Sequence, residues 1–139
     1  MKTAAVAGVV LLIFTLCGCN HSTSPGPVSI VHPDSNVEKL ADGFRFTEGP
    51  ACDAQGNVFF TDIPNNRILQ WSVEGTLSIF LDDSGGANGL FFDRRGNLIA
   101  CAGGRGRLVS ISPPKDVTVL ADRYEGRSFN SPNDLWIHP

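Results

Sequence analysis

The feature that most restricts the fold of this chain is an internal repeat with a period close to forty residues. The segment GPACDAQGNVFFTD, which begins at Gly49, matches GLFFDRRGNLIACA, which begins at Gly89. Arg67 and Arg107 are also 40 residues apart. A period in this range predicts stacked supersecondary units, each of which needs neighbours to bury its hydrophobic faces.

Each repeat unit has the pattern of four short β-strands joined by turns. Asp53 and Asp93 each begin an Asp-x-x-Gly turn, in which the carboxylate accepts local backbone N–H groups and the glycine takes a positive φ. The alternating segments that we expect to form strands are ACD, NVFFTD, RILQWSV and TLSIFLD in the first unit, and GLFFD, NLIACA, RLVSI and VTVLAD in the second. Four strands in about forty residues predict one blade of a β-propeller, so the expected fold class is all-β.

The first eighteen residues predict a lipoprotein-type export signal. Lys2 precedes an apolar run over residues 4–16, which is too short for a comfortable membrane span. The run ends in LCGC, which resembles the lipobox of bacterial lipoproteins and makes Cys19 the expected lipidation site; an ordinary secretory signal is the alternative. Several acyl chains on Cys19 would hold the protein at a membrane, at about 0.8 kcal/mol per buried methylene. We therefore expect an exported protein, either anchored as a lipoprotein or periplasmic or secreted.

The rest of the chain divides into a tether and a folded part. Residues 19–36 are rich in Ser, Pro and Asn and predict a flexible tether. Residues 37–139 are expected to form the N-terminal part of a propeller: two full blades, an outer strand at 37–42, and the first strand of a third blade at 135–137. On this interpretation the chain is a truncated fragment of a larger ring.

Composition and motifs exclude several functions. Eleven basic residues against fourteen acidic ones, with no basic cluster, argue against nucleic acid as a partner. There is no G-x-S-x-G motif, which argues against serine hydrolase chemistry. Cys52 and Cys101 lack metal-site spacing; export would permit a disulfide, but two free thiols are slightly favoured.

Three polar residues occupy the same position in successive repeats, directly before a predicted first strand. They are Glu48, Asn88 and Asn133, at steps of 40 and 45 residues. Because first strands line the central channel of a propeller, we expect these side chains to converge on it. Their carboxylate and amide oxygens suit Ca²⁺ or Mg²⁺. Ordinary turn residues that satisfy local N–H groups are the alternative.

Residues 37–139 resemble the gluconolactonase family, which includes senescence-marker protein (regucalcin). The segments that carry the resemblance are FRFTEGPACDAQGNVFFTDIPNNRILQW, GANGLFFDRRGNLIACAGGRGRLVSI and FNSPNDLWIHP. The resemblance implies a six-bladed propeller that holds one divalent cation in its channel, most often Ca²⁺, with Mg²⁺ or Zn²⁺ as alternatives. It also implies that the complete protein hydrolyses a small sugar lactone.

The resemblance assigns roles to particular residues. Glu48 matches a metal ligand, Asn133 a residue that contacts metal or substrate, and Asn88 a substrate-binding residue. Asp134 would orient Asn133, touch a second ion or cap a turn. The general base is expected beyond Pro139, so no catalytic residue is predicted within the chain and the chain alone is expected to be inactive. The competing interpretations are a non-catalytic cell-surface binding module and an inactive truncated product.

Overall fold

The computed structural model of the protein describes residues 31–138 and divides the chain into two units, residues 1–38 and 39–139. In the first unit, residues 31–38 contain a turn closed by a hydrogen bond from the Ser35 N–H to the His32 carbonyl, 2.9 Å long. The predicted export signal and the predicted lipidation site Cys19 lie outside the described residues. Within residues 31–138, no helix is long and apolar enough to cross a membrane.

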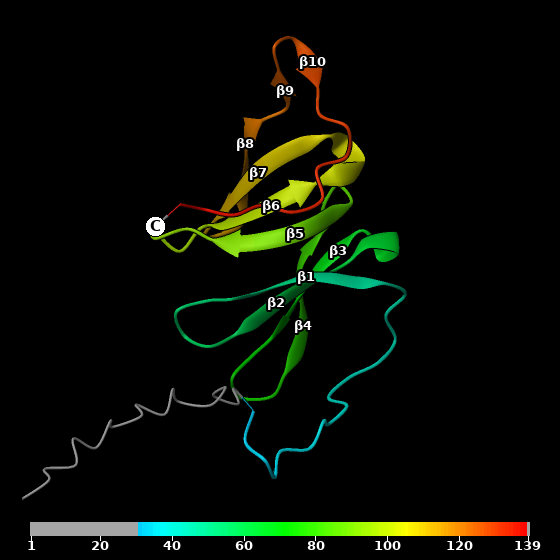
Figure 1. Cartoon of the computed structure of the whole chain (residues 1–139), viewed down its shortest axis with the longest axis vertical. Coiled ribbons are helices and arrows are strands. Elements are labelled where there is room, and N and C mark those ends of the chain that lie inside the picture. The colour runs from blue at the N-terminus through cyan, green and yellow to red at the C-terminus, as the bar shows by residue number, and fades with distance from the viewer. Residues whose placement is uncertain (1–30, 139) are drawn as a thin grey trace, which may run out of the picture. The chain divides into compact units, whose positions relative to one another are not determined.

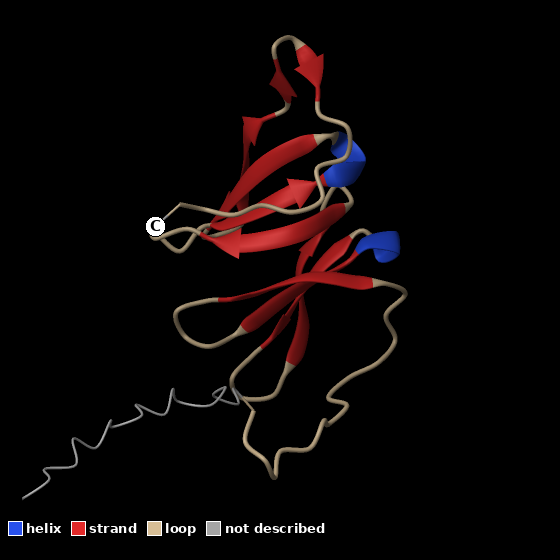
Figure 2. Cartoon of the chain, viewed as in Figure 1, coloured by secondary structure: helices blue, strands red, loops and turns tan. Residues whose placement is uncertain are grey.

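The second unit contains two four-stranded antiparallel sheets of the same design (Figures 1 and 2). The first sheet consists of β1 (Thr47–Cys52), β2 (Val58–Asp62), β3 (Arg67–Trp71) and β4 (Leu77–Asp82), in that order. The second sheet consists of β5 (Ala87–Phe92), β6 (Leu98–Ala102), β7 (Arg107–Ser112) and β8 (Asp116–Ala121), again in sequence order. The predicted strands of both repeat units are therefore confirmed.

Short elements outside the two sheets complete the unit. A single 3-10 turn joins the second and third strand of each sheet: η1 (Ile63–Asn65) and η2 (Gly103–Arg105). A small hairpin of β9 (Arg123–Tyr124) and β10 (Arg127–Ser128) follows the second sheet.

The turns between the first two strands of each sheet share one hydrogen-bond pattern. Asp53 accepts the N–H groups of Gln55 and Asn57, at 2.9 and 2.8 Å, and the Asn57 side-chain amide at 2.8 Å. Asp93 makes the three corresponding bonds, each 2.8 Å long. Burial opposes ionisation of both carboxyls, but these bonds outweigh it and lower the pKa of each. The turn chemistry expected from the repeat is therefore present twice.

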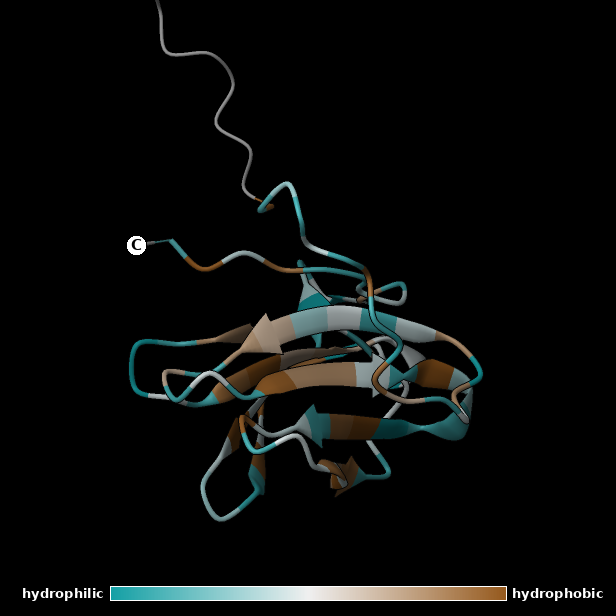
Figure 3. Cartoon of the chain, turned by 90° about the horizontal axis from the view of Figure 1, so that it is seen from below, coloured by the Kyte–Doolittle hydropathy of each residue, from teal (hydrophilic) through white to brown (hydrophobic). Residues whose placement is uncertain are grey.

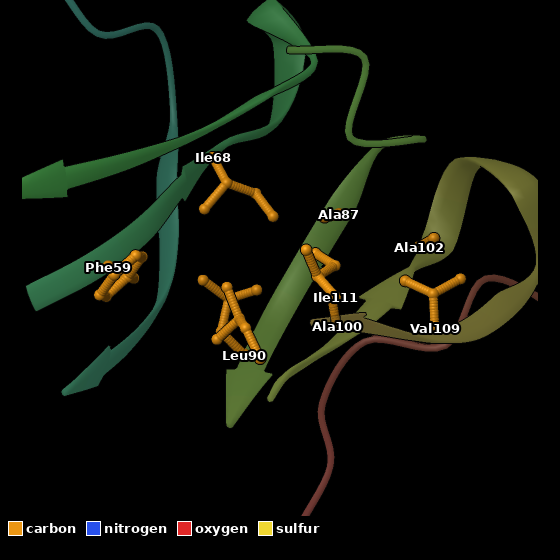
Figure 4. Packing of buried hydrophobic residues seen from close by; sticks show 9 residues of the cluster. Phe59, Ile68, Ala87, Leu90, Ala100, Ala102, Val109 and Ile111 are labelled. Carbon is orange, nitrogen blue, oxygen red and sulfur yellow. The ribbon is translucent and has the colours of Figure 1, made fainter. Parts of the chain in front are cut away.

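The main hydrophobic core lies between the two sheets (Figure 4). Phe59 and Ile68 of the first sheet face Leu90 and Ile111 of the second, and Ala100 leaves room for them. Hydrophobic residues are concentrated on the strands, and the turns between strands are mostly polar (Figure 3). A single sheet could not bury both of its faces, so the contact between repeats is what makes each one stable.

Two predicted strands are absent from the structure. Residues 37–42 and 135–137 form no strand. A strand needs a hydrogen-bonded neighbour, and none of the described strands pairs with either segment. Leu40 and Ala41 instead line a hollow over the first sheet together with Trp71. Residues 129–138 run beside β5 and β6 (Figure 1).

Candidate functional site

The backbones of the three predicted site positions lie next to one another. Gly49 of β1 packs directly against the backbone of Asn88 and Gly89 in β5: a methyl group at Gly49 would be 2.8 Å from the Gly89 Cα. The same kind of contact recurs between β5 and the segment that contains Asn133. The Gly89 N–H donates a 2.7 Å hydrogen bond to the Asn133 carbonyl, and a methyl group at Gly89 would be 2.8 Å from that oxygen. The structure therefore brings together the three segments that begin with Glu48, Asn88 and Asn133.

Glycine is required at Gly49 for two reasons. Its φ of +53° lies in the left-handed region, which L-residues with a Cβ rarely adopt. Its missing side chain also lets β1 reach β5 at backbone distance. The TEGP motif, with glycine directly after Glu48, therefore sets the contact between the sheets as well as the site.

A buried hydroxyl joins the first two site positions. Thr61 of β2 is fully buried, and its Oγ1 lies 3.1 Å from the Glu48 carbonyl and 3.2 Å from the Asn88 carbonyl. One hydroxyl hydrogen is thus shared between the first strands of two sheets. Sequence inspection missed this residue because its counterpart, 40 residues later, is Cys101.

The three side chains differ in exposure. Glu48 and Asn133 are exposed and Asn88 is half-buried. Within residues 31–138, none of these three side chains makes a hydrogen bond or ion pair, so their oxygens are available to a ligand. A cavity of about 350 Å³ beside Glu48 is also lined by Pro50 and Phe60, but Asn88 and Asn133 do not line it. The structure thus aligns the three backbones without placing the side chains around one shared cavity.

Asp134 has a local partner. Its Oδ1 accepts the N–H of the next residue, Leu135, at 2.8 Å. Burial raises the pKa of the neighbouring Cys101 thiol, and the negative charge of Asp134 adds to this effect. Cys101 is therefore a protonated, inert thiol. Cys52 and Cys101 are both free, as favoured from the sequence.

Asp62 is a second residue that sequence inspection missed, and it holds the chain leading into β1. The side chain is fully buried and forms a 2.9 Å ion pair with Arg67. It also accepts the N–H groups of Arg45 and Phe46, at 3.1 and 3.2 Å. Burial opposes ionisation, but the bonds from Asn65, these two N–H groups and Arg67 outweigh it and lower the pKa of Asp62 to about 2. The second repeat has Ala102 at this position, so the repeat gave no signal for it.

The side chains at the three aligned positions offer oxygen atoms as ligands for a cation. Within residues 31–138, no group of three or more His, Cys, Asp or Glu side chains could hold a metal ion. A cation at the aligned positions would therefore be bound by Glu48 together with amide oxygens. Hard cations such as Ca²⁺ accept these ligands, whereas a soft, thiol-binding metal would find no suitable group among the three.

The consecutive four-stranded sheets, packed face to face through their first strands, define this chain as part of a β-propeller. Residues 46–139 match the family described as SMP-30/Gluconolactonase/LRE-like region. The chain belongs to this family. The fold class expected from the repeat is thereby confirmed.

Individual relatives agree with this assignment. A gluconolactonase of Zymomonas mobilis is 30% identical over 129 residues. A gluconolactonase structure from Xanthomonas campestris is 33% identical with a TM-score of 0.66, over 68% of this chain and 32% of that one. A structural-genomics target assigned to the gluconolactonases is 40% identical with a TM-score of 0.69, over 73% of this chain and 36% of that one. A virginiamycin B lyase from Staphylococcus aureus, 13% identical with a TM-score of 0.52, shares the fold alone.

The match covers most of this chain but only part of each relative. The aligned region spans 82% of this chain and 36% of the Zymomonas mobilis protein. This chain therefore corresponds to about a third of the length of the relatives that it matches.

Proposed function

We propose that the full-length protein hydrolyses a sugar lactone with the help of a divalent cation, and that Glu48, Asn88 and Asn133 form one side of its binding site. The proposal is supported by the family of the chain and by relatives named gluconolactonases. The single observation that carries it within the chain is the repeated backbone contact from Gly49 to Asn88 and from Gly89 to Asn133.

The aligned residues fit a hard cation. Glu48 offers the one carboxylate among the three positions, and Asn88 and Asn133 offer neutral amide oxygens. Ca²⁺ takes about 6–8 oxygen ligands, so these side chains would supply part of the shell and other donors the rest. Mg²⁺ and Zn²⁺ remain alternatives to be separated by titration. A bound cation would act as a Lewis acid on the lactone carbonyl.

The residues of this chain would bind and orient rather than transfer protons. Glu48 would balance the charge of the cation from its exposed position on β1. Asn133, and Asn88 beside it, would donate amide hydrogens to the hydroxyl groups of the sugar and orient the ring. Asp134, next to Asn133, would help to orient it; we assign no catalytic residue within residues 31–138.

The test is lactone hydrolysis by the full-length protein, followed in a pH-stat with gluconolactone and added Ca²⁺. Glu48→Gln keeps the size of the side chain and removes its charge, so we expect at least a tenfold loss of kcat/KM and weaker Ca²⁺ binding in calorimetry. Glu74→Gln is the matched control, because Glu74 is exposed in the turn between β3 and β4. Equal activity and Ca²⁺ affinity in wild type and Glu48→Gln would remove Glu48 from the site. Lactone binding without turnover in the wild type would favour the non-catalytic binding module.

We also propose that the protein is exported and carries lipid on Cys19. The support is the apolar run over residues 4–16 and the LCGC sequence that ends it. Metabolic labelling with an alkyne fatty acid in a bacterial host should label the wild type and leave Cys19→Ser unlabelled. Equal labelling of both proteins would contradict the assignment.

A further inference from the structure

A cavity of about 820 Å³ lies between the two sheets, at the strand ends opposite the predicted lactone site. Glu48 and Asn88 stand at the starts of β1 and β5, whereas the cavity is lined by the turns that follow their ends, at Asp53 and Asp93. The turn between β7 and β8 closes a third side. Its volume is in the range of sites for small organic ligands. Neither the family assignment nor the proposed lactone hydrolysis gives this cavity a role.

The floor of the cavity is aromatic. Phe59 is almost fully buried and makes edge-to-face contacts with Phe80 and Phe92, with ring centroids 4.9 and 5.1 Å apart. Phe80 and Phe92 are only partly buried and remain accessible to a ligand. An aromatic or alkyl group placed here would bury apolar surface on both partners, which favours binding.

The rim of the cavity carries a positive charge. Arg94, Arg95 and Lys115 line it. Within the described residues none of the three lies within ion-pair distance of a carboxylate, although the charge of Arg95 helps to lower the pKa of Asp93. The Lys115 Nζ lies 5.1 Å from the centre of the Phe80 ring, so this cation already sits over the aromatic floor. The two acidic residues of the rim, Asp53 and Asp93, have both carboxylate oxygens hydrogen-bonded within their own turns.

From the aromatic floor and the unpaired cations, we propose that this cavity binds a small amphipathic anion: a molecule with an aromatic or alkyl body and one carboxylate or sulfonate group. The body would lie against Phe80 and Phe92, and the anionic group would lie at Arg94, Arg95 and Lys115. The site is separate from the predicted lactone site and would bind its ligand whether or not the protein is a lactonase.

The test compares two fluorescent probes that share one ring system. 1-Anilinonaphthalene-8-sulfonate is anionic, and N-phenyl-1-naphthylamine is its neutral counterpart. We expect the full chain to bind one molecule of the anionic probe, at least tenfold more tightly than the neutral one. Decanoate and 2-naphthoate should each displace it, which compares alkyl and aromatic bodies. If the neutral probe binds as tightly as the anionic one, the cavity is an apolar crevice and the proposal fails.

Three variants make the test specific. Changing Arg94, Arg95 and Lys115 together to Gln should weaken the anionic probe at least tenfold and change the neutral probe less than twofold. Arg127→Gln, on the hairpin that follows β8, should change neither. Ala54→Trp should fill the cavity and abolish binding of both. All five substituted residues are exposed, and circular dichroism would check that each variant keeps the fold. Unchanged anionic binding in the triple variant, or in Ala54→Trp, would overturn the proposal.

Discussion

At the scale of single residues, Gly49 is the position with the least room for change. Gly49→Ala would place a methyl group against the Asn88 carbonyl and force a left-handed φ on alanine. We expect a loss of about 2–5 kcal/mol in the free energy of unfolding, since strain costs about 1–2 kcal/mol and overpacking about 1–3 kcal/mol. Urea denaturation would measure it.

Gly43→Ala is the matched control, because Gly43 has a φ of +85° and a methyl group added there would meet nothing within 4 Å. It should lose only the conformational part, about 1–2 kcal/mol. If the two substitutions cost the same, the close approach of β1 to β5 contributes nothing to stability.

Thr61 gives a second prediction at this scale. Thr61→Val keeps the shape and removes the hydroxyl that faces the Glu48 and Asn88 carbonyls. Two part-buried backbone carbonyls then lose a donor, so we expect a loss of about 1–3 kcal/mol in the free energy of unfolding. Thr61→Ser should retain most of the stability, and Thr76→Val, at an exposed turn position, should change it little. If the Thr61→Val variant were as stable as the wild type, the shared hydrogen bond would contribute nothing to the free energy of unfolding.

At the scale of elements, Asp62 ties the residues before β1 to the end of β2 and the start of β3. The pKa of the Asp62 carboxyl is about 2 in the folded chain, compared with 3.8 for an unperturbed aspartate. A carboxyl whose pKa is lowered by folding stabilises the fold at pH values above its unfolded pKa. This stabilisation is lost as the pH falls through the pKa of the folded state. We therefore expect about 2 kcal/mol of stability to disappear between about pH 5 and pH 2.

Denaturation at several pH values would check this. Asp62→Asn cannot titrate, so its stability should fall less steeply than that of the wild type across the same range. The remaining fall in the variant reports the other carboxyls whose pKa values are lowered, which are Asp53, Asp83, Asp93 and Asp122. Identical slopes in wild type and variant would contradict the assignment to Asp62.

The strands of both sheets could be predicted from the sequence, because each repeat encodes its own turn and its own alternation. The Asp53 and Asp93 turns are local, so their chemistry is visible in four residues. Residues 37–42 and 135–137, predicted as strands of incomplete blades, form no strand here, because a strand depends on a partner elsewhere in space. Thr61 and Asp62 were missed because their contacts are not repeated in the second sheet. The alignment of Glu48 with Asn88 could be predicted at the level of the backbone, but the directions of their side chains could not.

At the scale of the whole molecule, the donor set predicts the behaviour of the 139-residue chain by itself. Glu48, Asn88 and Asn133 supply fewer oxygens than the roughly 6–8 that Ca²⁺ takes. We therefore expect no hydrolysis of gluconolactone above the uncatalysed rate, and weak Ca²⁺ binding, in a pH-stat assay and by calorimetry. Turnover that depends on Glu48 would show that these residues suffice.

The contact of Gly49 with Asn88, repeated from Gly89 to Asn133, determines which substitutions a propeller of this kind can accept. At each step main chain meets main chain, so a side chain larger than hydrogen at Gly49 or Gly89 would push the neighbouring segment away. Asp62 and Ala102 therefore differ between the two repeats while the glycine contact is kept, whereas Thr61 takes part in that contact through its bonds to the Glu48 and Asn88 carbonyls. A mutation that pushes two glycine-bearing strands apart would instead shift every later blade.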